Sequence, residues 1–563
     1  MHRDPYQAEI AIAGGGPIGL LLALFLDRFG IRSVLFNTEA DARPHPKGST
    51  HNARTMEHYR WLGLSPRIRP LGLAPDRPTD VAYFTRLTGW ELARFRMPSE
   101  LEKRRMVETS AATDQVPEPL LRTNQMYVEA FLLAHARTRP NITLRFGWEV
   151  DKFAEDADGV TVEAQAMEGD ATGTREAWRA SYLVGCDGGR SFVRRSLSGR
   201  YEGFSQVESD QFGGRMLASY VRAPTLYRDF LAPRVSWQYW VINPQMRAPI
   251  VALRDDEEFL VFSKPKDDEP PSDEVLARWI RGAVGADLPL QMIAHRAWTA
   301  GVALVAERFQ VGRVFLAGDA AHLFTPTGGF GMNTGVDDVS NLAWKLAAAV
   351  QGWAGPGLLP TYELERRPIA LRNTGAAREF SLKIAGLQMP AALEEDSAEG
   401  NAARQQLGAQ LSTLVEEFAS IGVQLGARYD GSPVISPGGA PPADDYARYT
   451  PSNVPGGRTP HCWVDQGRDL GSPLYDRLGL GLTLLRLGGT ATSSDPIERA
   501  ARARSIPFTV LDIPDADIRD LYGYDLALVR PDQYLAWRGN ALPSDPDALL
   551  ALVVGHRTGS AGT

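Results

Sequence analysis

Short hydrophobic runs, separated by glycine turns and a helical stretch, open the chain. Residues 8–13 read Ala-Glu-Ile-Ala-Ile-Ala, a pattern that predicts a short buried strand. Residues 17–29 place leucine and phenylalanine on one side of a helix, and residues 33–36 form a second apolar run of strand length. A strand, a glycine turn, a helix and a strand make a βαβ unit, so we expect a parallel sheet here.

The middle of the chain favours strands and then returns to a helical pattern. Residues 236–242 and 258–262 are apolar runs typical of an antiparallel sheet. Residues 313–317 predict another buried strand, from which a glycine-rich loop leads to a long helix over about residues 336–351. We therefore expect both a parallel and an antiparallel sheet before residue 390.

Composition changes after about residue 390. Residues 392–420 are polar and helix-prone, and residues 431–458 are rich in Pro, Gly, Ser and Asp, as in a linker. Beyond them, helix-like segments alternate with short apolar runs at 482–487, 508–511, 526–529 and 534–537. This alternation predicts a small, separate α/β domain at the C-terminal end.

Charge and cysteine content narrow the class of protein. The 563 residues include 60 Lys and Arg against 68 Asp and Glu, a formal net charge of −8. A dedicated nucleic-acid binder needs a basic excess to neutralise phosphates, so we expect no nucleic-acid partner. The only two cysteines, Cys186 and Cys462, can build neither a disulfide framework nor a cysteine-based zinc site, and we expect no metal.

The start of the chain gives an expectation about its location. The first residues lack the charged-then-apolar order of a signal peptide. The longest apolar run near them, residues 18–26, is far shorter than the roughly 20 residues that cross a bilayer. With so few cysteines, we expect a soluble protein of the reducing cytoplasm with no membrane partner.

The first motif lies between the first predicted strand and helix. Residues 14–19 read Gly-Gly-Gly-Pro-Ile-Gly and fit the pattern G-x-G-x-x-G. Such glycines permit a tight turn, the close approach of a pyrophosphate and close packing of the helix on the strand. The helix N-terminus then presents amides and a positive dipole to the phosphates. This context predicts a dinucleotide site; the alternative is a glycine-rich surface turn.

A carboxylate about 20 residues further on should bind the ribose hydroxyls. The second predicted strand ends in Asn37, Thr38 and Glu39, so the expected position holds an amide. An amide can still hydrogen-bond a hydroxyl, although without the help of a charge. Glu39 is either its replacement or a solvated surface carboxylate.

Two more motifs follow later strands. Asp187-Gly188-Gly189-Arg190 comes after an apolar run and is either a capped turn before a helix or part of a binding site. Gly318-Asp319 opens a loop through Pro326 to Asn333, whose backbone N–H groups could converge on one anionic oxygen. The carboxylate of Asp319 suits polyol hydroxyls, and His322 is either catalytic or a packing residue.

Together these motifs resemble the FAD-dependent aromatic hydroxylases, the flavoprotein monooxygenases of the para-hydroxybenzoate hydroxylase type. The resemblance spans about residues 7–375 and includes Arg54 to Glu57, Gln125 with Glu129, and Glu365 to Pro368. It is greatest to the hydroxylases of phenols and aromatic polyketides, which carry a C-terminal thioredoxin-like domain without redox cysteines. Residues 457–463 and 529–539 are similar to the opening and closing segments of that domain.

The resemblance implies a division into domains. A Rossmann-like α/β FAD-binding domain would take residues 1–390, as about 1–195 and 300–390, with an inserted antiparallel-sheet substrate domain at about 196–299. A helical segment and linker would occupy 391–455. A thioredoxin-like α/β domain without redox cysteines would occupy 456–563, and since no C-x-x-C exists it could not perform dithiol chemistry.

It also implies roles for individual residues around non-covalent FAD. The expected cofactor-binding residues are Gly14, Gly16, Pro17 and Gly19 at the pyrophosphate, Asn37 and Thr38 at the adenosine end, Lys47 near the phosphates, Arg54 as the mark of the following helix, Gln125 and Asp319 along the polyol chain, Asp187 at the shared FAD and nicotinamide motif, and Pro326, Gly329, Gly331, Met332 and Asn333 around the isoalloxazine ring. Asn37 and Lys47 depart from the family's usual glutamate and arginine.

The implied activity is hydroxylation of a small aromatic substrate, phenolic or polycyclic, with O₂ and NADPH or NADH through a flavin C4a-hydroperoxide. Baeyer–Villiger oxygenation, epoxidation and oxidative decarboxylation on the same fold are alternatives. For the base that favours the phenolate, the candidates are Tyr239, expected beside Trp237 on one strand face, and His51. Tyr239 can equally be a packed aromatic. The substrate's identity, the choice of nicotinamide and the oligomeric state, a homodimer included, stay open.

Overall fold

The computed structural model of the protein describes residues 6–109, 116–168, 172–197, 200–204, 214–254, 257–264, 271–300, 302–464 and 472–556. Its first layer is a six-stranded sheet in the order β19-β20-β11-β1-β2-β7. The strands are β1 (Ile10–Ala13), β2 (Ser33–Asn37), β7 (Ile142–Phe146), β11 (Tyr182–Gly185), β19 (Gln310–Val311) and β20 (Val314–Leu316). The predicted βαβ unit is therefore confirmed, with β1 at the centre of the sheet.

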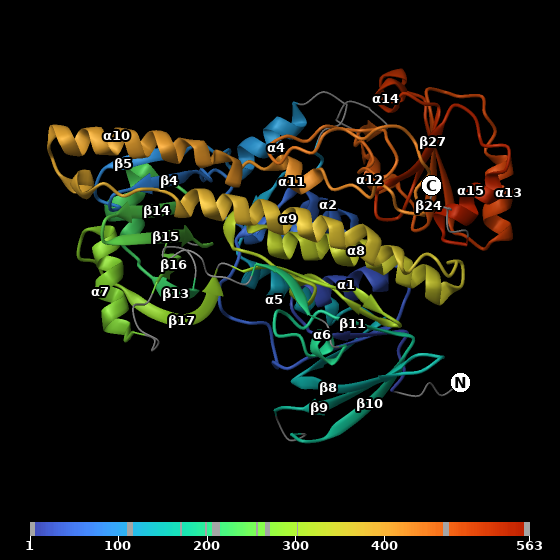
Figure 1. Ribbon diagram of the computed structural model, residues 1–563, viewed down its shortest axis with the longest axis horizontal. Helices are drawn as coiled ribbons and strands as arrows, with labels where there is room; N and C mark the ends of the chain where they lie inside the picture. Colours follow the sequence, from blue (N-terminus) through green and yellow to red (C-terminus); the bar gives the residue numbers. More distant parts are fainter. Residues whose placement is uncertain are drawn as a thin grey trace.

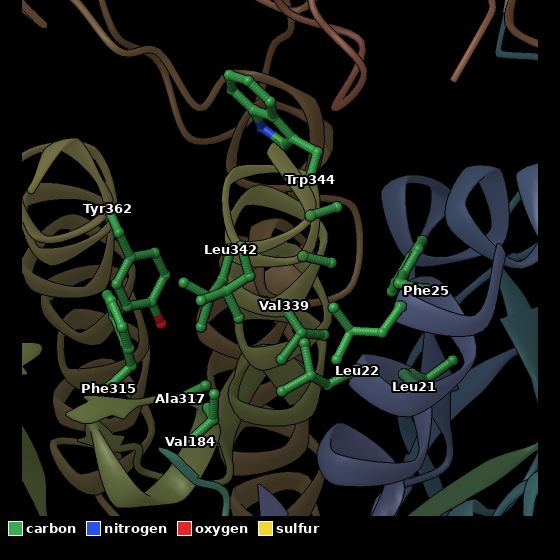
Figure 2. Packing of buried hydrophobic residues seen from close by; sticks show 14 of the residues in the cluster. Leu21, Leu22, Phe25, Val184, Phe315, Ala317, Val339, Leu342, Trp344 and Tyr362 are labelled. Carbon is green, nitrogen blue, oxygen red and sulfur yellow. The ribbon is translucent and has the colours of Figure 1, made fainter. Parts of the chain in front are cut away.

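Two helices cover the centre of this sheet. Helix α1 (Pro17–Arg28) is buried over almost its whole length, and α8 (Phe330–Gln351) packs along it. Figure 2 shows Leu22 of α1 and Val339 of α8 meeting above Val184 of the sheet. The helices can approach this closely at Gly335, where an added Cβ would lie 2.8 Å from Ile18 Cδ1. Helix α8 begins at Phe330, earlier than the expected start at about residue 336 and inside the segment that the sequence predicts as a loop.

The second large sheet has seven strands in the order β17-β13-β16-β15-β14-β4-β5. They are β4 (Val81–Phe84), β5 (Glu91–Phe95), β13 (Gly214–Arg222), β14 (Gln238–Asn243), β15 (Met246–Ala252), β16 (Glu258–Ser263) and β17 (Gln291–Ala300). The sheet is antiparallel apart from β14 and β4, which pair in parallel. The range expected for the substrate domain, 196–299, is therefore too narrow, because β4 and β5 come from an earlier part of the chain.

Smaller sheets and helices complete this part of the molecule. The strands are β3 (Thr50–His51) with β6 (Leu121–Arg122), β8 (Trp148–Glu155) with β9 (Val160–Ala166) and β10 (Arg175–Ala180), and β12 (Tyr201–Phe204) with β18 (Ala303–Ala306) and β21 (His322–Leu323). The helices are α2 (Ala53–Trp61), α3 (Ser65–Ile68), α4 (Glu100–Glu108), α5 (Gln125–Ala136), α6 (Phe192–Ser196) and α7 (Asp273–Val284).

A helical segment links the two large sheets to the C-terminal domain. Helix α9 (Thr361–Ala385) runs beside α8 across the molecule, and α10 (Ala398–Ser412) returns over β5 (Figure 1). A short 3₁₀ helix, η7 (Thr413–Glu417), and α11 (Ile421–Leu425) follow. The segment 391–425 thus belongs to the main body, with α10 packed on β5 and α11 packed on α2.

The C-terminal domain is a four-stranded sheet in the order β25-β24-β26-β27, seen at the red end of Figure 1. Strands β24 (Leu482–Leu487) and β25 (Phe508–Ile513) are parallel, whereas β26 (Leu526–Val529) and β27 (Leu535–Gly539) are antiparallel. The helices are α12 (Leu474–Arg477), α13 (Asp495–Ala503), α14 (Ala516–Tyr522) and α15 (Pro546–Val553), and β22 (Trp463–Val464) pairs with β23 (Ser472–Pro473). Cys462 is completely buried in this domain's core. Across the described part of the chain, no helix combines the length and apolarity needed to span a membrane.

Candidate active site

The three sequence motifs meet at one edge of the six-stranded sheet. Strand β11 pairs in parallel with β1 on one side and with β20 on the other. The glycine turn follows β1, Asp187 follows β11 and Asp319 follows β20, so all three loops leave carboxyl ends of adjacent strands. In open α/β sheets, ligands bind at this edge.

The glycine turn is built to admit an anion. Gly14 has φ +108°, which favours glycine, and its Cα lies against the backbone of Cys186 and Asp187. Gly19 packs on the carbonyl of Gly14, where a Cβ would collide. At Gly16, in contrast, a Cβ would meet no atom within 4 Å, and among the described residues no side chain caps the start of α1. The open helix N-terminus therefore fits a pyrophosphate.

A cavity of about 480 Å³ continues from this edge toward the seven-stranded sheet. This volume is within the range of pockets for small organic ligands. One wall comes from the side of the six-stranded sheet, with Lys47, Asp319, Pro326 and Gly329 among its residues. The opposite wall comes from the seven-stranded sheet, and η7 and α11 close the remaining side.

Aromatic rings dominate the sheet wall. The lining includes Trp237, Trp240, Phe262 and Trp298, with Phe418 beside them from the segment after η7. Phe262 and Trp298 meet edge to face at 6.3 Å between ring centroids. Such a wall offers flat apolar faces to a flat ligand, whose rings can stack or make edge contacts with it.

The wall on the side of the six-stranded sheet ends at the start of a long helix. Gly328 and Gly329 both have left-handed backbone angles, φ +78° and +67°, and α8 begins directly after them. Among the described residues no side chain caps this helix and no acidic residue lies in its first turn. Its free N–H groups and positive dipole favour negative charge at this end of the cavity.

Comparison with known families accounts for this arrangement. A profile described as an FAD binding domain matches residues 7–377, and one described as the C-terminal region of aromatic-ring hydroxylases matches residues 452–557. The chain belongs to the FAD-dependent aromatic-ring hydroxylases.

Relatives of this hydroxylase match nearly its full length. It is 31% identical to the FAD-dependent monooxygenase apdD of Emericella nidulans over 581 residues, covering 96% of this chain and 88% of that one. A putative polyketide hydroxylase of Streptomyces halstedii is 32% identical over 567 residues, covering 96% and 94%. The structure of the rebeccamycin biosynthetic enzyme RebC with reduced flavin is similar with a TM-score of 0.86, at 31% identity, covering 99% of this chain and 100% of that chain. The protein is thus an FAD-dependent monooxygenase, as the sequence predicts.

Several expected cofactor residues have structural contacts that limit what they can offer FAD. The side-chain oxygen of Asn37 accepts a hydrogen bond from Gly15 N–H at 3.1 Å, and its amide nitrogen donates to the carbonyl of Glu39. Asn37 therefore shapes the glycine turn itself. Thr38 is exposed, and Glu39 pairs with Arg43 at 2.5 Å.

For Asp187, the sequence leaves two alternatives open, a capped turn before a helix or part of a binding site, and its two carboxylate oxygens differ in this respect. Its Oδ2 accepts the N–H of Val193 at 3.0 Å, so the carboxylate helps to begin α6. Its Oδ1 is buried and has no hydrogen-bond partner among the described residues. Burial raises the pKa of Asp187. One oxygen thus caps the helix, while the other has capacity for a further donor.

Asn333 acts as a clamp behind the cavity wall. Its Oδ1 accepts from Asn52 N–H at 2.9 Å and from Thr55 Oγ1 at 2.7 Å, and its Nδ2 donates to the carbonyls of Thr50 and Gly329. All four side-chain hydrogen-bonding positions are occupied, and Asn333 does not line the cavity. Met332 packs at the edge of the main core, and Gly331 lies against Phe324.

Gln125 lies next to the lysine segment, outside the cavity lining. Its backbone N–H donates to the carbonyl of Gly48 at 2.8 Å, and its side-chain nitrogen donates to Glu129 at 3.3 Å. The start of α5 is thereby held against the segment that carries Lys47.

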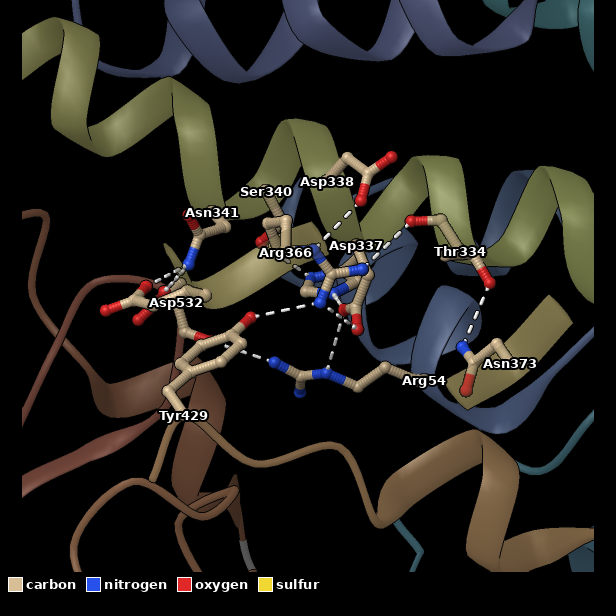
Figure 3. A network of polar contacts seen from close by, with 12 residues as sticks. Arg54, Thr334, Asp337, Asp338, Ser340, Asn341, Arg366, Asn373, Tyr429 and Asp532 are labelled. Carbon is tan, nitrogen blue, oxygen red and sulfur yellow. Dashed lines mark hydrogen bonds and ion pairs between the residues drawn. The ribbon is translucent and has the colours of Figure 1, made fainter. Parts of the chain in front are cut away.

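Arg54 lies in the first turn of α2, the helix that its motif is expected to mark. Its guanidinium donates to Glu57 at 2.8 Å, to Gln533 at 2.6 Å and to the carbonyl of Asp532, all of them buried. Figure 3 shows Arg54 in a polar network between α8, α9 and the C-terminal domain. The side chain is thus used to join domains, and its place among the cofactor-binding residues stays a prediction.

Tyr239 and His51, the two candidate bases, are both absent from the cavity lining. Tyr239 lies in the core on the other face of the seven-stranded sheet, where its hydroxyl accepts the N–H of Ser236 at 2.8 Å. Trp237 precedes β14, so the alternation of strand faces does not extend back to it, and the two rings do not share a face. His51 is fully buried against Tyr59, and burial lowers its pKa to about 3.

Sequence reasoning missed three charged residues of the cavity, Arg122, Arg296 and Glu417. None of them belongs to a motif, and Glu417 lies in a segment that looks like a polar helix before a linker. The hydrogen-bond partner of His322 was also missed. It is Asp338, at 2.6 Å, which lies sixteen positions further along the chain and so could not be found from the local sequence. Only the fold brings these groups together.

Proposed function

We propose that this monooxygenase hydroxylates a flat, fused-ring phenol, using FAD, O₂ and NADPH or NADH. The observation that supports the proposal is the cavity wall of three tryptophans and two phenylalanines facing the glycine-rich start of α8. Flat aromatic faces suit a polycyclic substrate, whereas an aliphatic one would gain nothing from their geometry. The similarity to a putative polyketide hydroxylase agrees with this substrate class.

The open glycine turn and uncapped α1 fit FAD, which when bound supplies activated oxygen and the redox equivalents taken from NAD(P)H. In this proposal, Gly14, Gly16 and Gly19 receive the pyrophosphate beside α1, and Asp319 binds the polyol chain. Lys47 reaches the FAD phosphates, and Pro326 and Gly329 border the flavin ring, where the N-terminus of α8 stabilises negative charge. The sheet wall positions the substrate ring and excludes water.

Oxidative decarboxylation is a second candidate. It is favoured by the cations Lys47, Arg122 and Arg296, which line the same cavity and could bind a carboxylated ring. One solved RebC complex contains a 7-carboxy ligand. The two reactions differ in their product, because decarboxylation releases CO₂.

The test is a screen of phenolic compounds for faster NAD(P)H consumption by the FAD-loaded enzyme, followed by product analysis with ¹⁸O₂. A fused-ring phenol should accelerate consumption and leave with one labelled oxygen on the ring. Its O-methyl ether should accelerate consumption less, because the ring loses its phenolate donor. Release of CO₂ in step with NAD(P)H consumption would favour decarboxylation, whether or not the ring carries label, and no stimulation by any fused-ring phenol would contradict the proposal.

A further inference from the structure

One carboxyl group in the cavity wall has no role in the site described so far. Glu417 is the last residue of η7 and lines the cavity together with Phe418. The residue is only 7% exposed, and its Oε2 has no hydrogen-bond partner among the described residues. A buried carboxyl oxygen without a partner is costly, so a donor on a bound molecule would relieve that cost.

The surroundings of Glu417 connect both walls of the cavity. On the FAD-domain side, the backbone of Gly328 gives it a hydrogen bond. Arg122 of β6 attracts it without forming an ion pair in the described part of the chain. Burial raises the pKa of the Tyr83 phenol on β4, and the nearby charge of Glu417 adds to this effect. Further along the lining, the titratable or charged groups are His45, Lys47, Arg296 and Asp319.

Arg122 is held in place by contacts of its own. Its guanidinium lies over the ring of Trp237, with 4.0 Å from Cζ to the ring centroid, and it donates to Thr50 Oγ1. Its Nε is buried and lacks a hydrogen-bond partner among the described residues. A cation fixed on an aromatic face can therefore stabilise an anion in the cavity.

The balance of charge around Glu417 suits proton transfer. Burial raises its pKa to about 8, and the attractions of Arg122 and Gly328 only partly oppose this effect. A base with a pKa this close to that of a phenol takes its proton far more readily than an ordinary carboxylate does.

We propose that Glu417 is a catalytic residue that accepts the proton of the substrate's phenolic hydroxyl, while Arg122 stabilises the phenolate. This inference rests on the proposed hydroxylation. The O–H bond breaks, its electron pair stays on the phenolic oxygen, and the proton moves to a carboxylate oxygen of Glu417. After the ring has gained oxygen, it releases its own ring proton to water as it becomes aromatic again, and Glu417 returns its proton to the phenolic oxygen.

The test compares Glu417→Gln with Glu416→Gln in the FAD-loaded enzyme. Gln has nearly the same shape but cannot accept the proton, whereas Glu416 is the exposed neighbour that pairs with Lys383 on the surface. With a naphthol as substrate, Glu417→Gln should lower product formation at least roughly 100-fold while flavin content is unchanged. Glu416→Gln should behave like the wild type.

Two further readouts separate proton transfer from a merely structural role. For the wild type, kcat/KM should rise with pH and level off above about 8, because only the ionised carboxylate accepts a proton; Glu417→Gln should lack this rise and Glu417→Asp should keep it at a lower rate. A nitro-naphthol that is already ionised at the assay pH should lose much less activity in Glu417→Gln.

Equal losses with the neutral and the ionised naphthol, or an unchanged pH profile in Glu417→Gln, would overturn the role of Glu417 alone. Failure of the proposed function would look different: the wild type itself would then form no hydroxylated product from any phenol. If Glu417→Gln does not retain flavin, the pH dependence of kcat/KM in Glu417→Asp is compared with that of the wild type instead. Loss of the pH-dependent rise in Glu417→Asp would then overturn the proposal.

Discussion

Gly16 and Gly19 lie within one turn of α1, yet the structure gives them opposite surroundings. Gly19 touches the carbonyl of Gly14, whereas Gly16 faces open space at an allowed φ of −71°. Gly19→Ala should therefore destabilise the flavin-free protein by roughly 1–3 kcal/mol through overpacking. Gly16→Ala should leave that stability within about 0.5 kcal/mol, but weaken FAD binding roughly tenfold or more, because its methyl group would occupy the pyrophosphate position.

Urea unfolding of the flavin-free proteins and fluorescence titration with FAD measure the two effects separately. Each variant is the control for the other, since both add one methyl group to the same motif. Unchanged FAD affinity in Gly16→Ala would mean that the pyrophosphate lies elsewhere.

At the residue scale, the sequence predicts where the glycines of the turn are needed, because backbone geometry alone determines their use. It does not predict the contacts of Arg54 and Tyr239, because these depend on which face of an element is covered by distant parts of the chain. Arg54 meets the C-terminal domain, and Tyr239 meets the core behind the seven-stranded sheet. Glu417 could not be found at all from local pattern, since a glutamate in a polar helix is usually solvated.

Among the elements, α8 connects the cavity with the rest of the molecule, and Asn333 in its first turn holds the segment around Thr50 in place. Replacing Asn333 by Ala removes four side-chain hydrogen bonds, which predicts a loss of about 2–4 kcal/mol in the free energy of unfolding. FAD affinity should also fall, because Gly329 loses one of its anchors.

Asn401→Ala, an exposed position on α10, is the matched control and should change the free energy of unfolding by less than about 0.5 kcal/mol. Chemical denaturation of the FAD-loaded proteins measures both variants. If Asn333→Ala is as mild as Asn401→Ala, the clamp is not important for this wall of the cavity.

Element boundaries show why the fold could be predicted further than the site. The runs at 482–487 and 526–529 become β24 and β26 without change, because short apolar runs between turns leave little choice of structure. The segment after residue 390 is different: its helical content is predictable, but its position against β5 is not. That position brings Glu417 and Phe418 into the cavity lining. The sequence alone therefore could not predict this side of the cavity.

On the scale of the whole molecule, buried ion pairs join the C-terminal domain to the helices behind the cavity. Arg530 donates to both oxygens of Glu365 on α9, at 2.7 and 2.8 Å, and Lys345 of α8 donates to the same carboxylate at 2.7 Å. All three side chains are completely buried. Arg458 similarly contacts Glu57 of α2 at 2.5 Å. The C-terminal domain, which has no pair of redox cysteines, thus supplies buried ionic contacts to the main body.

Removing one partner of such a network leaves charge without compensation in a medium that solvates it poorly. Arg530→Met, which keeps much of the side chain's apolar volume, should therefore lower the free energy of unfolding by roughly 3–5 kcal/mol. Arg504→Met is the control. It removes an ion pair with Asp547 in the same domain, and because Asp547 is half exposed, the loss should be no more than about 1 kcal/mol.

Chemical denaturation, with the C-terminal domain and the flavin followed as separate signals, measures both variants. If the network anchors the domain, Arg530→Met should lower the unfolding midpoint of both signals. A flavin signal unaffected by Arg530→Met would mean that the C-terminal domain does not support the FAD domain through this contact.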